Sequence, residues 1–422
     1  MALYYRSAVS VLLFCACLAV PVSAESLRNI LQDSLSSAPE ILEAGANIQS
    51  AQHRTEQASA QHWPVVSVAG NKIIDQYHRE RDDYYKTRFT PSVKAEMNLY
   101  AFGAIEKNVE RSRKEEEYYQ HRYSSTQEEL AYTISRLYLQ ALNMKEAVQI
   151  MRKSLQRHKK ILANLDVIAS NDIGRESEYV QAEARIIMIE QNINRYNKQL
   201  SNTLANLSKY TKLKIDERNL HNPFKSLTDE QLFTRYSVKE KSHNPIYKAQ
   251  QTELETRQLA VQAENSKDFP KVNLVGSASR DDRYVGVEVS WDILNRGNSY
   301  SVQEKTSEVI AASQRLERIS RDIDNISEIA KINIQESRTQ LKTLKAQISA
   351  STKVVDFYQM QFDIARRSLL DVLNAERELA DVELSFVNTE HELRSAMLDY
   401  LYSQGKITAW GNVKTKNNLN FK

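Results

Sequence analysis

The sequence predicts a mainly α-helical chain with four short β-strands, arranged as two copies of one plan. Residues that interrupt helices are scarce, with only 9 Gly and 7 Pro among 422 residues. These residues also recur in order along the chain. Three pairs of them are each separated by 206 positions: Pro39 and Pro245, Pro64 and Pro270, and Gly70 and Gly276. A shared offset of this kind is typical of an internal duplication.

Each copy begins with an amphipathic helix that runs from its first proline to its second. Two short alternating runs follow, and a very long helical region completes the copy. We place the two copies at 25–208 and 243–404, with a linker at 209–242 between them and a polar tail at 405–422.

The alternating runs predict the strands, since side chains of a strand point to opposite faces in turn. One face of the last run holds these residues: Val285, Val287, Val289, Trp291 and Ile293. We place the strands at about 65–74, 88–100, 271–280 and 284–294. Each has about ten residues, the length of a strand that crosses a membrane. A half-buried hairpin of a soluble domain would show the same alternation, so both interpretations remain open.

The helical regions are unusually long. Residues 104–173 and 298–404 contain neither Gly nor Pro, and their apolar residues recur at heptad-like spacing. A helix of 60–70 residues is about 100 Å long, so such helices pack side by side as coiled coils do. We expect breaks near 171–174 and near 366–368.

Four strands are too few to close a barrel within one chain, since single-chain barrels begin at eight strands. An open sheet edge is not tolerated in lipid. If the strands lie in a membrane, several chains must share one barrel, and three chains would supply twelve strands. The alternative is a soluble periplasmic coiled-coil scaffold in which 65–100 and 271–294 form a small β-domain.

The N-terminus resembles a secretory signal peptide. An apolar run at about 8–20 is followed by the small residues Val22-Ser23-Ala24, so we expect cleavage after Ala24 and a signal peptide at 1–24. Both cysteines, Cys15 and Cys17, lie in this segment. The mature chain would therefore hold no disulfide, cysteine nucleophile or cysteine metal site.

Composition and motifs argue against several function classes. The net charge is only +3, which gives no reason to expect nucleic acid as a partner. The eight histidines show no metal-ligand spacing, and no phosphate-binding loop or nucleophile motif is present. The carboxylates lie four residues from Lys or Arg on predicted helices, a surface arrangement. We therefore predict no enzyme activity, no cofactor and no metal site.

In one stretch, "ARRSLLDVLNAERELADVELSF" at 365–386, the polar residues are spaced more regularly than a surface helix needs. At helical spacing a polar stripe forms from Asp371, Asn374, Glu378, Asp381 and Ser385. One apolar file flanks it: Leu370, Leu373, Ala380, Leu384 and Val387. A second follows: Leu369, Val372, Leu379, Val382 and Phe386.

The chain resembles the TolC family of outer-membrane channel proteins over nearly all of its mature length. The duplication carries the resemblance, together with "PVVSVAG", "PKVNLVG", "VSWDILNRGN" and above all "RRSLLDVLNAEREL". The resemblance implies a homotrimer in which a long α-helical barrel crosses the periplasm. The four β-strands of each chain would contribute to a 12-stranded outer-membrane β-barrel. The linker and the tail would form an equatorial band.

The resemblance also assigns site residues at a periplasmic tip. Asp371 matches an acidic pore constriction, while the second acidic position of the family is Asn374 here. Arg367 matches a basic gate residue, and its partner would be Glu178. Phe362 stands where a family member that we align has Tyr, so a hydrogen bond would be missing.

Two further residues, Glu378 and Asp381, would belong to a stripe that faces the lumen. Three like carboxylates around a narrow axis attract cations, which suits a constriction.

The resemblance implies an exit duct that works with a periplasmic adaptor and an inner-membrane transporter of the ABC or another class. The motifs look more like the type I secretion branch, which passes unfolded protein cargo. A drug or small-molecule efflux channel is the alternative. Either function implies a location in the cell outer membrane, with outer-membrane lipid as a partner and an extension into the periplasm.

Overall fold

The computed structural model describes residues 27–72, 74, 89–169, 176–280 and 282–413. The predicted signal peptide, both cysteines and the expected break at 171–174 lie outside these residues. The α-helices are α1 (Leu27–Ser37), α2 (Pro39–Ser59), α3 (Ala104–Ala169), α4 (Glu176–Ser208), α5 (Asp229–Arg235), α6 (Pro245–Asn265), α7 (Arg296–Asp363), α8 (Leu369–Ser403) and α9 (Ile407–Trp410). The strands are β1 (Val65–Lys72), β2 (Phe89–Tyr100), β3 (Lys271–Ser279) and β4 (Arg283–Ser290).

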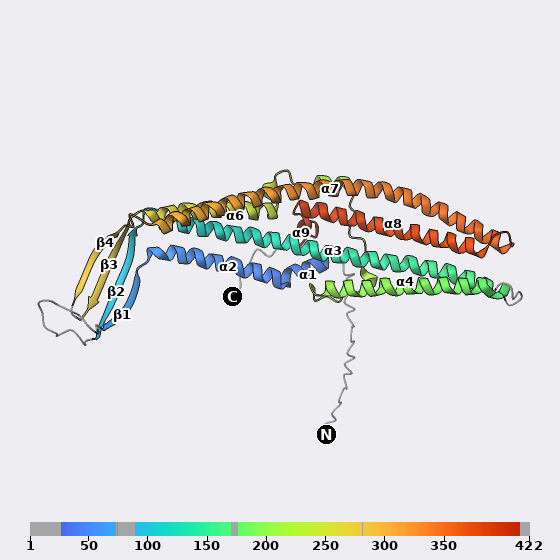
Figure 1. Cartoon of the computed structure of the whole chain (residues 1–422), viewed down its shortest axis with the longest axis horizontal. Helices are drawn as coiled ribbons and strands as arrows, with labels where there is room; N and C mark the ends of the chain where they lie inside the picture. The colour runs from blue at the N-terminus through green and yellow to red at the C-terminus, as the bar shows by residue number, and fades with distance from the viewer. Residues whose placement is uncertain (1–26, 73, 75–88, 170–175, 281, 414–422) are drawn as a thin grey trace, which may run out of the picture.

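The helices form one elongated layer, with the sheet at one end and the helical turns at the other (Figure 1). Near the sheet, α2 packs on α3, α3 on α6, and α6 on α7. Toward the other end, which we call the tip, α4 packs on α3, α3 on α8, and α8 on α7. Two helices, α3 with 66 residues and α7 with 68, run through both halves. Long helices packed side by side confirm the predicted helical architecture.

The two copies start their first helices in matching ways. Pro39 and Pro245 both occupy the first turn, where a missing backbone N–H costs nothing. The caps differ, because the Asn244 side chain accepts hydrogen bonds from Ile246 N and Tyr247 N, while Ala38 offers no side-chain cap. The expected break near 366–368 is also present, since α7 ends at Asp363 and α8 begins at Leu369.

The four strands form one antiparallel sheet in the order β1-β2-β3-β4. Its register aligns like residues across the strands. Val68 pairs with Val93, and Leu274 pairs with both Met97 and Val287. Because paired residues of an antiparallel sheet point to the same face, these pairs give the sheet one continuous apolar face.

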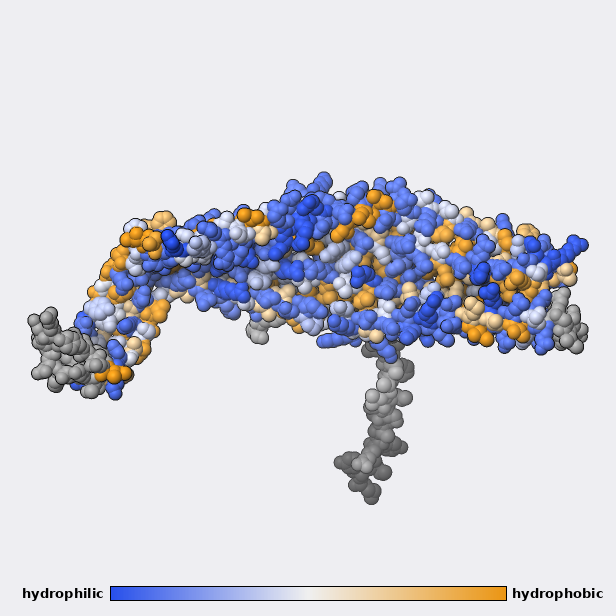
Figure 2. Space-filling model, viewed as in Figure 1, coloured by the Kyte–Doolittle hydropathy of each residue, from blue (hydrophilic) through white to orange (hydrophobic). Residues whose placement is uncertain are grey.

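That apolar face is exposed in the single chain. Val68, Val285 and Val287 are each more than half accessible, and apolar surface covers much of this end of the molecule (Figure 2). The opposite face is polar. There Asn98 Nδ2 donates to Asn273 Oδ1 at 2.8 Å, and Asn273 Nδ2 donates to Glu96 Oε1 at 3.0 Å. One apolar and one polar face agree with the alternation that predicted these strands.

The last strand is shorter than the predicted 284–294. It ends at Ser290, and Trp291 Nε1 then donates to the carbonyl oxygen of Asp268 at 3.0 Å. This bond ties the chain to the short turn that follows α6 before α7 begins.

The largest core lies midway along the layer, where α1, α9 and the segment after α4 cover α3 and α8. The sequence predicts a polar tail over 405–422, but residues 407–410 form α9 instead. Ile407 and Trp410 are buried there, and the Trp410 ring stacks on Phe224. Apolar side chains spaced three apart can bury one face of a short helix, which the polar character of 414–422 concealed.

Among the described residues, no helix combines the length and the apolar character that crossing a membrane requires.

Candidate functional site

The turn between α7 and α8 holds most of the residues that the sequence singled out. Ala365 adopts a left-handed conformation with φ of 57°, which reverses the chain after α7. Ser368 then caps α8. Its Oγ accepts a hydrogen bond from Asp371 N at 3.2 Å and donates one to Asp371 Oδ2 at 2.8 Å. Asp371 is therefore held by the helix start itself.

Arg367 is engaged within the same hairpin. Its Nη1 lies 3.9 Å from Asp371 Oδ2, and its guanidinium carbon lies 3.9 Å from the centre of the Tyr358 ring. The two side chains of the ion pair are 35% and 43% accessible. A pair as exposed as this contributes about 0–1 kcal/mol, so it positions Asp371 without locking it.

Glu178 lies on the neighbouring hairpin, in the first turn of α4, and is half-buried. A carboxylate at a helix N-terminus is stabilised by the helix dipole. The predicted link between Arg367 and Glu178 stays a prediction.

Phe362 belongs to the apolar core of the tip. Its ring is 4% accessible, and the cluster around it joins four helices. The other buried members are Ile161, Leu165, Ala182, Leu369, Val372 and Leu373. Phe362 therefore ties the α7–α8 turn to α3 and α4 through packing. Its predicted role in a gate stays a prediction.

The polar stripe lies along the accessible side of α8. Asp371 and Asn374 are partly exposed, whereas Glu378 and Asp381 are exposed. The flanking apolar files are mostly buried, with Leu370 as an exception at 51% accessible. The stripe is therefore available to whatever faces this side of the layer.

Buried charges between α3 and α8 were missed by the sequence reasoning, which placed carboxylates on exposed helix faces. Arg157 Nε lies 2.6 Å from Glu376 Oε2, and Arg157 Nη2 lies 3.1 Å from Glu383 Oε2. The Glu376 side chain is only 4% accessible. Burial lowers the pKa of Arg157, but the charges and hydrogen bonds of both glutamates outweigh burial, so its pKa is raised.

A second group of charges lies closer to the middle of the layer. Arg394 is 3% accessible, and its two Nη atoms contact Glu146 at 2.8 and 3.0 Å. Its Nη2 also lies 2.7 Å from Glu390 Oε2. Burial raises the pKa of Glu146. A sequence signal existed, because Glu376, Glu383 and Glu390 are spaced by seven and therefore share one helix face.

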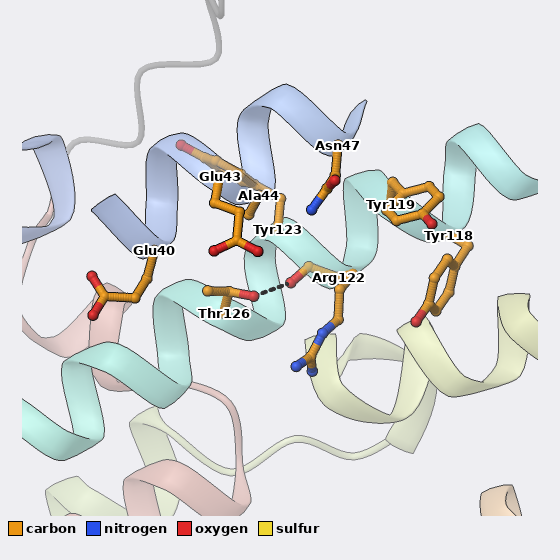
Figure 3. A pocket seen from close by; sticks show the side chains of 9 residues that line it. All are labelled: Glu40, Glu43, Ala44, Asn47, Tyr118, Tyr119, Arg122, Tyr123 and Thr126. Atoms are coloured by element: carbon orange, nitrogen blue, oxygen red, sulfur yellow. Dashed lines mark hydrogen bonds between the residues drawn. The ribbon is translucent and has the colours of Figure 1, made fainter. Parts of the chain in front are cut away.

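A hollow of about 310 Å³ opens between α2 and α3 (Figure 3). Glu40 and Glu43 line it from α2, and three tyrosines line it from α3: Tyr118, Tyr119 and Tyr123. Burial raises the pKa of Tyr118 and of Tyr123, which keeps both phenols neutral. The hollow holds no nucleophile next to a base. Among the described residues, no group of three or more acidic, His or Cys side chains is placed to hold a metal ion.

Comparison with known proteins places this architecture among outer-membrane channels. The outer-membrane channel OprN superposes with a TM-score of 0.78 at 19% identity, covering 90% of this chain and 89% of that one. The CmeC outer membrane channel of Campylobacter jejuni gives a TM-score of 0.78 at 13% identity, covering 93% and 87%. At these identities the likeness concerns the fold.

The family follows from the sequence match. The model of the outer membrane efflux protein family matches residues 30–211 and 238–399, and the chain belongs to this family. It is an outer-membrane protein and not an enzyme. It is also 23% identical over 167 residues to the outer membrane efflux protein BepC of Brucella suis. That alignment spans about a third of each protein, 35% of this chain and 36% of BepC.

Proposed function

We propose that three copies of this chain form an exit duct through the outer membrane, which extends into the periplasm as a helical tube. The observation that carries this proposal is the sheet. It exposes a continuous apolar face, while Glu96, Asn98 and Asn273 interact on the other face. A sheet with apolar residues outward and polar residues inward suits a lipid exterior and an aqueous interior.

The edges of the sheet support the same proposal. β1 and β4 each pair with one strand only within the described chain. Unpaired backbone groups are very costly in lipid, so pairing of β4 with β1 of the next copy would remove both edges. Twelve strands from three chains lie within the range of known barrels.

The α7–α8 turn is proposed as the periplasmic gate of this duct. Asp371 and Asn374 would then line the constriction, and Glu378 and Asp381 would continue the lumen stripe above it. Three copies of Asp371 around one axis would attract cations. A weak link from Arg367 to Glu178 would suit a gate that a periplasmic adaptor opens.

Two cargo classes follow from different observations. The stretches "SLLDVLNAERELADVE" and "AMLDYLYSQGKITAWG" resemble the type I secretion branch, which favours unfolded protein delivered by an inner-membrane ABC transporter. The family is that of outer membrane efflux proteins, and BepC is also an outer membrane efflux protein, which favours small molecules as the second candidate. Deleting the gene separates the two. Loss of specific proteins from the culture medium supports secretion, and increased drug sensitivity with an unchanged medium supports efflux.

Single-particle electron microscopy of the detergent-extracted protein tests the duct itself. We expect a three-fold hollow particle, with a detergent belt around the sheet end and helices extending from it. A monomeric rod without a belt would contradict the duct and favour a periplasmic scaffold.

A further inference from the structure

A second hollow, of about 230 Å³, lies between the linker, α7 and the end of α8. The end of α8 is midway along the helical layer (Figure 1). Two ion pairs hold the linker on α7 in this region, Lys241 with Asp324 at 2.5 Å and Asp229 with Arg338 at 2.8 Å. The hollow lies beside the first pair. Pockets for drug-sized ligands begin at roughly 300 Å³, so this hollow suits a smaller ligand.

The floor of the hollow is polar and buried. We define it as the four lining residues that are each less than a tenth accessible: Asn244, Tyr400, Ser403 and Gln404. Three of them are engaged by the chain itself. Asn244 Nδ2 donates to the Ser403 carbonyl oxygen at 2.7 Å, and Ser403 Oγ donates to the Tyr400 carbonyl oxygen at 2.8 Å. Gln404 Oε1 accepts from Val238 N at 2.9 Å, which attaches the linker to the floor.

The fourth floor residue, Tyr400, has an unused hydroxyl group. Tyr400 is 2% accessible, and its ring packs edge-on against Phe233 with 5.0 Å between the ring centroids. Its phenolic oxygen forms no hydrogen bond to another residue within the part of the chain that the structure describes. A buried phenol usually finds a hydrogen-bond partner, because burying an unpaired hydroxyl costs free energy. A ligand in the hollow would supply this partner.

The rim of the hollow is basic. Three lysines line it, Lys239, Lys241 and Lys331, against the single carboxylate of Asp324. Lys241 is engaged by Asp324. Lys331 lies 3.4 Å from Glu328, but both side chains of this pair are exposed, so the pair is weak and Lys331 can turn toward a ligand. Lys239 forms no ion pair with any of the described residues. The lining therefore carries an excess of positive charge.

We infer that this hollow binds a small oxyanion of the phosphate class, which bridges the linker to α7 and α8. The lysine ammonium groups would offset the charge of the ligand, and hydroxyl groups would donate to its oxygens. Besides Tyr400, Ser327 of α7 is placed for this. Its Oγ accepts from Gln404 Nε2 at 3.1 Å, which leaves the Ser327 proton for a ligand. The site lies within one chain, so the inference does not depend on the proposed duct.

Equilibrium dialysis of the detergent-extracted protein with radiolabelled inorganic phosphate tests the site. We expect saturable binding. Tyr400→Phe should weaken it about tenfold, because a hydroxyl that donates to a charged ligand is lost. The ring stays on Phe233 and no hydrogen bond among the described side chains is removed, so the fold should be retained. Tyr402→Phe is the matched control, since Tyr402 packs on Tyr132 outside the hollow.

The charge of the rim is tested separately. Lys239→Gln should also weaken phosphate binding about tenfold, because one charged donor is lost. Lys225→Gln removes the same charge from an exposed position of the linker outside the hollow, and should leave binding unchanged. Absence of saturable binding to the unmodified protein would overturn the site. Equal affinity of the unmodified protein and all four variants would overturn it as well.

Glycerol 3-phosphate distinguishes two sources of the same chemistry. Tighter binding of inorganic phosphate than of glycerol 3-phosphate would identify a free oxyanion as the ligand. The opposite order would identify the phosphate group of a larger molecule. Both results support the site, provided that Tyr400→Phe weakens the tighter ligand. A tighter ligand that Tyr400→Phe leaves unaffected would overturn it.

Hydrogen exchange gives a second, independent readout of the bridge. The Val238 amide, which donates to Gln404, reports whether the linker separates from the floor. Saturating phosphate should slow exchange of this amide in the unmodified protein, because a ligand that binds the closed arrangement opposes local opening. At the same phosphate concentration Tyr400→Phe should show less slowing. Exchange that phosphate leaves unchanged in the unmodified protein would contradict the bridge.

Discussion

The sheet and the helical layer differ in which side chains they expose and which they enclose. The sheet exposes Val68, Val285 and Val287 and gathers polar side chains on its other face. The helical layer exposes polar residues along α8 and buries charged ones, such as Arg394 and Glu376, between α3 and α8. Exposed side chains tend to be apolar in lipid and polar in water. The difference therefore agrees with lipid around the sheet and water around the helical layer.

The largest expected effect comes from the buried charge in the helical layer. Arg394→Leu should cost about 3–5 kcal/mol of unfolding free energy, because it leaves Glu146 and Glu390 without their cation. Arg315→Leu is the control, since its pair with Glu253 is half exposed on the arginine side and contributes about 0–1 kcal/mol. Hydrogen exchange of the α8 amides measures the unfolding free energy of both variants. Equal losses of unfolding free energy would contradict the expected difference between the buried and the exposed ion pair.

A charge on the apolar face of the sheet should have the next largest effect. If this face contacts the membrane interior, Val287→Arg should lower the free energy of unfolding by about 2–4 kcal/mol. It should also reduce the amount of protein in the outer-membrane fraction. Glu288→Arg places the same group on the opposite face, one residue away, and should be tolerated. If both variants disappear from that fraction alike, the faces do not meet different solvents.

The buried histidine near the tip predicts a smaller, pH-dependent effect. Burial lowers the pKa of His158, whose ring donates to the Ser154 carbonyl oxygen at 3.0 Å. Between its ordinary value of 6.5 and the lowered pKa, the unfolded chain binds more protons. The free energy of unfolding should therefore fall as the pH drops through this window.

His158→Gln should flatten this dependence when melting temperatures at pH 7.5 and pH 5.5 are compared. His53→Gln, at an exposed position on α2, serves as the control and should leave the dependence intact. A wild-type protein whose melting temperature rises on acidification over this range would contradict the sign.

The smallest effect on stability is expected at the exposed stripe. Asp371→Ala removes a weak ion pair with Arg367 and should change the unfolding free energy by about 0–1 kcal/mol. Its effect should appear in conduction instead, as lower selectivity for cations over anions in planar bilayers. Asp381→Ala, three turns further from the tip, should change selectivity less. Equal selectivity of Asp371→Ala and the unmodified channel would exclude Asp371 from the constriction.

Most of the architecture was predictable because local signals and the fold agree. Proline and glycine positions gave the duplication, period-two alternation gave the strands, and the absence of helix breakers gave α3 and α7. The α7–α8 turn lies at the predicted break near 366–368, and in the structure Ser368 caps the helix that follows. These signals lie within a few residues of the elements that they specify.

The remaining features depend on residues far apart in the sequence. Arg157 meets Glu376 across 219 positions. The spacing of Glu376, Glu383 and Glu390 by seven shows that they share a helix face, but it does not show that Arg157 and α3 cover that face. The exposure of Leu370 follows from the orientation of α8 against α7, which spacing alone does not give. The prediction of a polar tail was wrong at Ile407 and Trp410, because a four-residue helix carries little periodicity.

The docking of α9 has a consequence for biogenesis. Glu128 accepts hydrogen bonds from Ile407 N at 2.8 Å and Thr408 N at 3.1 Å, across 279 and 280 positions. The same core needs Leu27 and Leu31, from the beginning of the described chain. A nascent chain therefore cannot complete this core before α9 has been synthesised. We expect this core to form only after synthesis, which would suit a chain that crosses a membrane before it folds.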